Sequence, residues 1–216
     1  MESFERRYTE IWDEFVDDIV DLYKKSHPNR LSEGMSVHEQ LRSIYDLPKV
    51  KFREYMRRTS RADVPDVGSV TGFFFEDIVH FFVQSKLSST ANIIERNACS
   101  VTKLCEGLPV KKPDIFLSSG NRHVFIEVKF APKLRDINYV EDIQSRIATG
   151  KNERSLRYYL IGGWLSVNSV KLHRMTDHKD WMCFMQASER NKNTGYMDEF
   201  IRFDDLLETI KSFLQS

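Results

Sequence analysis

The sequence lacks long apolar runs and has few cysteines. No stretch of its 216 residues approaches the roughly 18 apolar residues of a membrane span. The first residues are acidic and amphipathic, the opposite of a signal peptide. Cys99, Cys105 and Cys183 are odd in number and lack the spacing of a metal site. These absences argue against a membrane-bound, secreted or zinc-binding protein and predict a cytoplasmic protein with reduced cysteines.

An excess of charge of either sign is also missing, because 32 basic residues balance 32 acidic ones. A zero net charge does not by itself indicate a nucleic-acid binder. The charges are unevenly distributed, however: residues 1–21 hold eight acids against two arginines, whereas Lys49–Arg61 holds six basic residues against Glu54 alone. Such asymmetry can conceal a basic patch. The segment Lys49–Arg61 is therefore either a solvated helical face or an element that contacts phosphates.

What the sequence does contain is enough apolar material for the core of one domain, with 41% hydrophobic and 12% aromatic residues. Apolar residues at three- and four-residue spacings predict an amphipathic helix over residues 2–26. A short helix is expected after Ser36, because Ser36 and Glu39 have the spacing of a capping box. Neither internal repeats nor low-complexity tracts interrupt the chain.

The segment Gly72–Lys86 is so apolar that it predicts a nearly buried helix. Thr71 is the expected N-cap. Glu76 and Asp77 would then lie in or near the first turn, where the helix dipole favours negative charge. His80 follows Glu76 by one turn on the same face, and we interpret it as a core histidine whose hydrogen bonds are satisfied.

The rest of the chain alternates between strand and helix patterns. The expected elements are a strand within Ala91–Val101, a hairpin, a helix from Asp136 as N-cap to Gly150 as stop, strands Tyr158–Trp164 and Trp181–Ala187, and a last amphipathic helix capped by Asp204. This order predicts an α/β fold: a mixed β-sheet flanked by helices, with an N-terminal helical extension.

The hairpin lies within Lys112–Phe130. Gly120 and Asn121 separate two apolar runs, and glycine supplies the positive φ of a tight two-residue turn. With the turn centred there, the numbers of cross-strand partners sum to 241, which places Asp114 opposite Glu127. The face of the second strand that points away from Glu127 is apolar, with Val124, Ile126, Val128 and Phe130.

The other face of this hairpin carries two acids and a lysine. Lys129 is two residues beyond Glu127 and so projects from the same face as that acid. Two adjoining carboxylates repel unless a cation or a proton lies between them. Mg²⁺ suits such a pair, because it takes one or two carboxylates and keeps waters and phosphate oxygens. The alternative is an exposed strand on which Lys129 only compensates Asp114 and Glu127.

The sequence Pro113-Asp114, followed after an interval by Glu127-Val128-Lys129, resembles the motif of the PD-(D/E)xK nuclease superfamily. The resemblance implies a restriction-endonuclease-like core. It implies that Asp114, Glu127 and the carbonyl of Val128 bind Mg²⁺, and that Lys129 acts on the attacking water. All three side chains would then be catalytic.

The resemblance extends over Thr71–Trp164, because the apolar helix resembles the first core helix of that superfamily. It implies a further catalytic acid on this helix, at Glu76 or, alternatively, Asp77. Residues 71–216 would form the nuclease core with a C-terminal extension. Residues 1–70 would form a helical region of the same domain that serves dimerisation or DNA contact.

Within the superfamily, a compact chain without a P-loop motif resembles an orthodox type II restriction endonuclease. The implied activity is Mg²⁺-dependent, sequence-specific hydrolysis of double-stranded DNA by a homodimer. Candidate DNA contacts lie in two basic segments and comprise Arg57, Arg58, Arg61, Arg190, Asn191, Lys192 and Asn193.

Two other functions fit the same residues. The first is a repair, recombination or junction-resolving nuclease, which would prefer branched DNA. The second is a non-catalytic nucleic-acid-binding module in which Glu127 and Lys129 form only a surface salt bridge.

Overall fold

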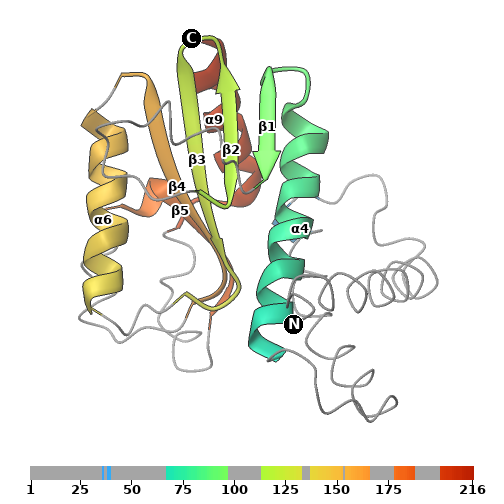
Figure 1. The fold of residues 1–216 in the computed structure, drawn as a ribbon, viewed down its shortest axis with the longest axis vertical. Helices are drawn as coiled ribbons and strands as arrows, with labels where there is room; N and C mark the ends of the chain where they lie inside the picture. The colour runs from blue at the N-terminus through green and yellow to red at the C-terminus, as the bar shows by residue number, and fades with distance from the viewer. Residues whose placement is uncertain are drawn as a thin grey trace, which may run out of the picture. The chain divides into compact units, whose positions relative to one another are not determined.

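The computed structural model describes residues 36, 38, 39, 67–96, 113–132, 137–152, 154–165, 178–187 and 200–216. The chain divides into Met1–Phe74 and Phe75–Ser216, and each unit is described by itself. The helices and strands are α4 (Val67–Leu87), β1 (Ile93–Arg96), β2 (Ile115–Ser119), β3 (Arg122–Lys129), α6 (Ile137–Asn152), β4 (Leu156–Leu165), the 3-10 helix η1 (Lys179–Trp181), β5 (Met182–Ala187) and α9 (Phe203–Gln215) (Figure 1).

The strands form one five-stranded sheet in the order β1-β2-β3-β4-β5. The first three strands are antiparallel, and β3, β4 and β5 are parallel. The parallel half needs long crossovers, of which α6 is the one between β3 and β4. The predicted α/β fold with a sheet of mixed direction is therefore confirmed.

The β2–β3 hairpin has the predicted register. Ile115 pairs with Ile126 and Ser119 with Arg122, so that partner numbers sum to 241. Gly120 has φ of 58°, the left-handed conformation that glycine adopts without steric cost. The turn is thus where the sequence predicted it, and the residue before β2, Asp114, reaches the level of Glu127.

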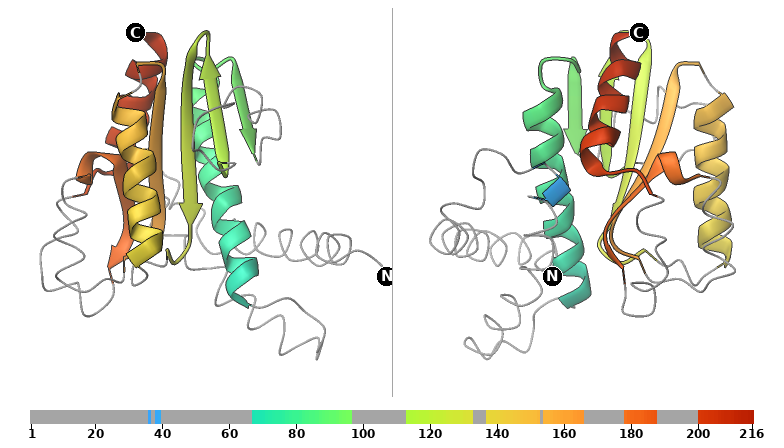
Figure 2. Two further views of the ribbon diagram at one scale, coloured as in Figure 1. Left: turned by 60° about the vertical axis from the view of Figure 1, so that its left-hand side comes forward. Right: turned by 180° about the vertical axis from the view of Figure 1, so that it is seen from behind.

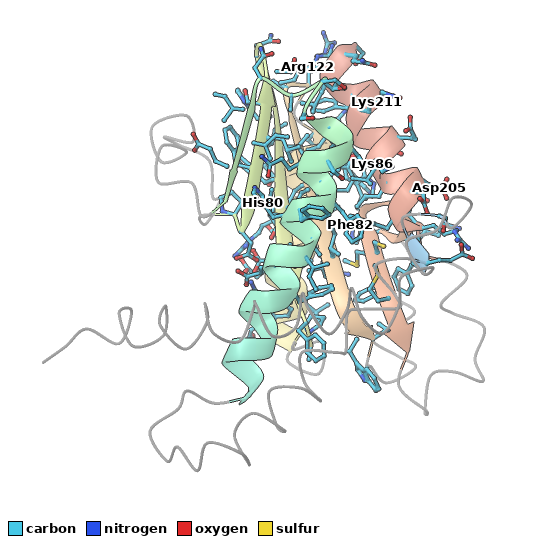
Figure 3. The ribbon with its side chains drawn as sticks, turned by 90° about the vertical axis from the view of Figure 1, so that its right-hand side faces the viewer. His80, Phe82, Lys86, Arg122, Asp205 and Lys211 are labelled. Carbon is cyan, nitrogen blue, oxygen red and sulfur yellow. The ribbon has the colours of Figure 1, made fainter. Side chains whose placement is uncertain are left out.

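Helices cover both faces of the sheet (Figure 2). On one face, α6 packs its Val140, Ile143 and Ile147 against Phe125, Tyr158 and Leu160 in one buried cluster. On the other face, α9 contacts β2, β3 and β5. The ring of Phe203 in α9 lies 6.5 Å from that of Phe82 in α4, so that α4 and α9 share this face (Figure 3).

Two predicted helix starts are wrong. α4 begins at Val67, so Thr71 is inside the helix, and Glu76 lies in the third turn rather than near the first. α9 begins at Phe203 after Arg202, and Asp204 is in the first turn instead of capping it. Threonine and aspartate favour a helix start without requiring one, and α9 begins one residue before Asp204, at the fully buried Phe203.

The predicted burial of α4 is only partly correct. Phe75, Val79 and Val83 are fully buried, whereas Phe81 is 65% exposed. The helix is therefore apolar on more than the face that meets the sheet.

Gly150 does not end α6, which continues to Asn152. Its role is a close approach between backbones: a Cβ atom at Gly150 would lie 2.8 Å from the backbone nitrogen of Tyr158. The glycine thus lets α6 pack tightly against the start of β4.

The capping box at Ser36 is confirmed. The backbone nitrogen of Glu39 donates to Ser36 Oγ at 3.2 Å, and that of Ser36 donates to Glu39 Oε2 at 3.1 Å. The predictions for residues 2–26, for Lys49–Arg61 and for Asp136 lie outside the described residues. Across the described part of the chain, no helix has the length and apolar character to cross a membrane.

Candidate active site

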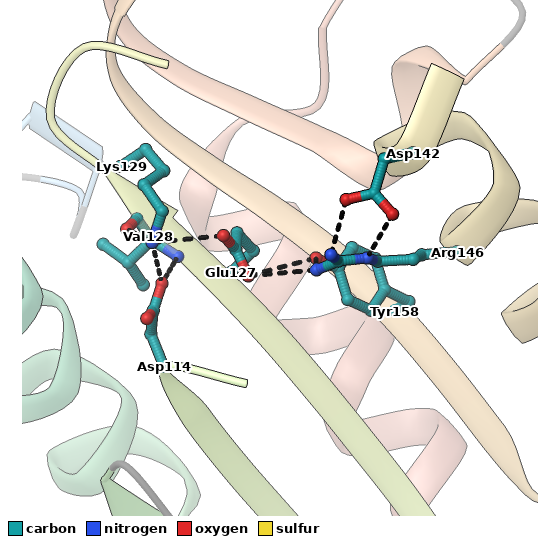
Figure 4. A network of polar contacts seen from close by, with 7 residues as sticks. All are labelled: Asp114, Glu127, Val128, Lys129, Asp142, Arg146 and Tyr158. Atoms are coloured by element: carbon teal, nitrogen blue, oxygen red, sulfur yellow. Dashed lines mark hydrogen bonds and ion pairs between the residues drawn. The ribbon is translucent and has the colours of Figure 1, made fainter. Parts of the chain in front are cut away.

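Asp114 directly precedes β2 and forms hydrogen bonds with the end of β3 (Figure 4). Its Oδ2 accepts a hydrogen bond of 2.7 Å from the backbone nitrogen of Val128 and one of 2.6 Å from Lys129 Nζ. The hairpin register sets this arrangement, because it brings the residue before Ile115 beside Glu127 and its neighbours.

Lys129 connects the two predicted metal-binding acids. Its Nζ lies 2.6 Å from Asp114 Oδ2, 3.1 Å from Glu127 Oε1 and 3.0 Å from the carbonyl oxygen of Val128. The side chains of Asp114 and Glu127 are 16% and 11% exposed, whereas that of Lys129 is 35% exposed. The acids are therefore largely buried, and solvent reaches the group from the side of Lys129.

The second oxygen of Glu127 contacts a buried group on α6 and β4. Arg146 Nη1 lies 3.4 Å from Glu127 Oε2, and the hydroxyl of Tyr158 donates to the same oxygen at 3.3 Å. Arg146 also donates to Tyr158 Oη at 3.0 Å and forms an ion pair of 2.5 Å with Asp142. Glu127 is thus held from the interior as well as from the solvent side.

Sequence reasoning missed Arg146, Asp142 and Tyr158. One signal was present: Asp142 and Arg146 are four residues apart, the spacing of an ion pair on one helix face. Arg146 also follows the apolar Ile143 by three residues and precedes the apolar Ile147, both of which are buried. A charged residue on an inward helix face needs a partner in the interior. The identity of that partner, Glu127, depends on how α6 packs on the sheet.

Burial and charge shift several ionisation equilibria at this site. Burial alone lowers the pKa of Lys129, but the charges of Glu127 and Asp114 outweigh it, and the pKa lies above its ordinary value. The pKa of Arg146 is raised in the same way, because Tyr158, Glu127 and Asp142 outweigh its burial. Burial and the charge of Glu127 raise the pKa of Tyr158. At neutral pH the site therefore holds two cations and a neutral phenol.

A further phenol, that of Tyr139, lies on α6 near the same charges. Burial and the negative charge of Glu127 raise its pKa. Its hydroxyl is buried and has no hydrogen-bond partner among the described residues. Tyr139, Asp142 and Arg146 follow one another at spacings of three and four, so they share one helix face.

Glu76 lies on the helix that packs beside the end of β3. It is buried, with 9% exposure, and the adjacent Phe75 places its ring 6.0 Å from that of Phe130, which follows Lys129. The structure thus places Glu76 in a buried part of α4, next to a residue that contacts the ring following Lys129. The alternative acid, Asp77, has a side chain outside the described part of the structure.

His80 departs from the prediction of a satisfied core histidine. It is half-buried, and its Nε2 has no hydrogen-bond partner within the described residues. The candidate DNA contacts cannot be placed in the same way, because Arg57, Arg58, Arg61 and Arg190–Asn193 all lie outside those residues.

The donor atoms suit Mg²⁺. Asp114, Glu127 and the carbonyl of Val128 are oxygen donors, and a cationic group already lies against one oxygen of each. No group of three or more histidine, cysteine or acidic side chains that could hold a metal occurs in the described stretches. A metal here would therefore depend on two carboxylates completed by backbone, water or substrate oxygens.

We compared the chain with protein-family models, with curated proteins and with solved structures, and none of these comparisons gave a match.

Proposed function

We propose that this chain is a Mg²⁺-dependent nuclease with a restriction-endonuclease-like core, and that it cleaves double-stranded DNA in the manner of a type II restriction enzyme. The observation that carries the proposal is the convergence of Asp114, Glu127 and Lys129 at one end of β3, where Lys129 Nζ lies 2.6 Å from Asp114 Oδ2 and 3.1 Å from Glu127 Oε1. The element order, with a helix before three antiparallel strands, a crossover helix and a parallel strand, supports it.

Asp114, Glu127 and the Val128 carbonyl would hold the metal. When bound, Mg²⁺ supplies Lewis-acid polarisation of a phosphoryl oxygen and activation of water. The chain keeps its two carboxylates close together and mostly out of solvent, where their interaction with a cation is stronger than in water.

Lys129 contributes a positive charge on the solvent side of the acids. It is the most exposed of the three side chains, so it is the one nearest to an incoming phosphate. Its ammonium can donate hydrogen bonds to the attacking water and to the phosphoryl oxygens on which negative charge develops.

Double-stranded DNA as substrate, and a homodimer that presents one site to each strand, are part of this proposal. The contacts proposed for DNA are those of the two basic segments, at Arg57, Arg58 and Arg61 and at Arg190–Asn193. A cytoplasmic location accords with such a substrate.

The test is cleavage of plasmid DNA by the purified chain in Mg²⁺ and in EDTA. We expect discrete fragments in Mg²⁺ and none in EDTA. Glu127→Gln removes a proposed metal ligand and should abolish cleavage. Glu141→Gln, an exposed acid on α6, is the matched control and should cleave at the wild-type rate.

Two other outcomes would replace the proposal. Preferential cleavage of branched DNA, without sequence preference, selects a repair or junction-resolving nuclease. Salt-sensitive DNA affinity without cleavage or metal binding selects a non-catalytic binding module.

A further inference from the structure

Lys129 contacts the oxygens that are proposed to bind the metal. Its ammonium lies against Asp114 Oδ2, Glu127 Oε1 and the carbonyl oxygen of Val128, at 2.6, 3.1 and 3.0 Å. These atoms come from the three residues that would bind Mg²⁺. One internal cation therefore holds together the oxygens that a divalent cation would need.

The second oxygen of Glu127 is engaged on the interior side. Its Oε2 already accepts a hydrogen bond from Tyr158 and lies 3.4 Å from Arg146. Arg146 is itself only 5% exposed and is fixed by Asp142, so the inner contact cannot be exchanged for one with solvent. A metal at this site would thus have to use Oε1, the oxygen that Lys129 contacts.

We propose that Lys129 is a resident cation that a divalent metal must displace, so that metal binding and the ammonium of Lys129 compete for the same carboxylates. Mg²⁺ takes its oxygen ligands at about 2.0–2.1 Å and repels a second cation held on the same atoms. The ammonium has a path outward, because the lysine side chain is long and 35% exposed. This inference takes the identity of the metal from the proposed function. Its test measures metal binding and does not require cleavage.

The competition has a consequence that distinguishes Lys129 from an ordinary active-site residue. Lys129→Met leaves every proposed ligand oxygen in place and removes the competing charge. The variant should therefore lose cleavage and yet bind the metal more tightly than the wild type, by at least about tenfold. A lysine that only supports the structure of the site would weaken metal binding when it is removed.

The experiment is calorimetric titration of the full chain with Mn²⁺ and with Mg²⁺, without DNA. Wild type, Lys129→Met and the control Lys86→Met, which changes an exposed lysine on α4, are compared. Tighter binding by Lys129→Met alone supports the inference. Equal or weaker binding by Lys129→Met, when the wild type binds metal, overturns the inference and leaves the proposed function standing.

The same titration separates failure of the proposed function from failure of the inference. If neither wild type nor variant binds metal, the metal-dependent function is wrong and the inference falls with it. Thermal unfolding with and without Mn²⁺ covers the case in which Lys129→Met folds poorly, because Asp114 and Glu127 then lack the cation that lies between them. Mn²⁺ should raise the melting temperature of the variant more than that of the wild type, and an equal or smaller rise contradicts the competition.

Discussion

Arg146 Nη1 lies 3.4 Å from Glu127 Oε2, deep in the molecule, while Lys129 Nζ lies 3.1 Å from Glu127 Oε1 on the solvent side. Glu127 therefore lies between two cations that differ in exposure to solvent. The inner one is buried and fixed by Asp142, and the outer one belongs to a partly exposed lysine. Substitutions at the two cations should therefore affect stability and the proposed chemistry differently.

Removal of the inner cation should destabilise the fold. Arg146→Met removes the buried cation beside Glu127 and Tyr158, which keep only the hydrogen bond between them. Because Glu127 keeps Lys129, we expect a loss of about 2–3 kcal/mol, below the 3–5 kcal/mol typical of a fully uncompensated buried charge. Urea unfolding measures this change in the free energy of unfolding. Lys211→Met on α9 is a surface control, expected to change the free energy of unfolding by less than about 0.5 kcal/mol. An equal effect in both variants would contradict the buried role of Arg146.

Two tyrosines near the site should respond differently to loss of their hydroxyls. Tyr158→Phe removes a donor to Glu127 and an acceptor for Arg146, so it should cost about 1–3 kcal/mol. Tyr139→Phe removes a buried hydroxyl that has no partner among the described residues, so the free energy of unfolding should stay equal or rise. Thermal or urea unfolding of both variants measures these changes. A larger loss of stability for Tyr139→Phe than for Tyr158→Phe would contradict the contacts assigned to the two hydroxyls.

Gly150→Ala tests the close packing of α6 on β4. Helix propensity alone would make alanine more stable than glycine by about 0.8–1 kcal/mol. The clash of a Cβ atom with the backbone of Tyr158 should reverse that sign and destabilise by about 1–3 kcal/mol. Gly72→Ala in α4, where a Cβ atom meets nothing within 4 Å, should stabilise instead. Stabilisation by both substitutions would argue against the close approach.

Acid should weaken the fold in part through His80. Burial lowers the pKa of His80 below its ordinary value of 6.5, so the unfolded chain binds a proton at a higher pH than the folded one. The contribution of neutral His80 to the free energy of unfolding is therefore complete above about pH 6.5, and it is lost as the pH falls through the pKa of His80 in the folded chain. His80→Phe should flatten the decline of unfolding free energy between about pH 6.5 and pH 5. An unchanged slope would exclude this role.

The part of the site that could be predicted from the sequence is local. A two-residue turn at Gly120 and Asn121 fixes the register of everything beside it, and Asp114 and Glu127 follow from counting. Lys129 follows from the period of two along a strand. These positions required no knowledge of how helices pack.

The parts that could not be predicted depend on packing over long sequence distances. Arg146 reaches Glu127 across 19 residues and Tyr158 reaches it across 31 residues. α4 begins at Val67, four residues before Thr71, because a residue that favours an N-cap does not by itself fix where a helix starts. The sequence pattern predicts a helix end at Gly150. The need for glycine there comes instead from the backbone of Tyr158 on the neighbouring strand, which leaves no room for a Cβ atom.

The rate of plasmid cleavage in Mg²⁺ tests most directly whether Asp114, Glu127 and Lys129 form a Mg²⁺-dependent hydrolytic centre, as proposed. Asp114→Asn and Lys129→Met should each lower the rate by at least about 10²- to 10³-fold. Asp180→Asn, an exposed acid in η1, should cleave as the wild type does. Wild-type chain that fails to cleave DNA in Mg²⁺, or Asp114→Asn that cleaves at the wild-type rate, would contradict the claim.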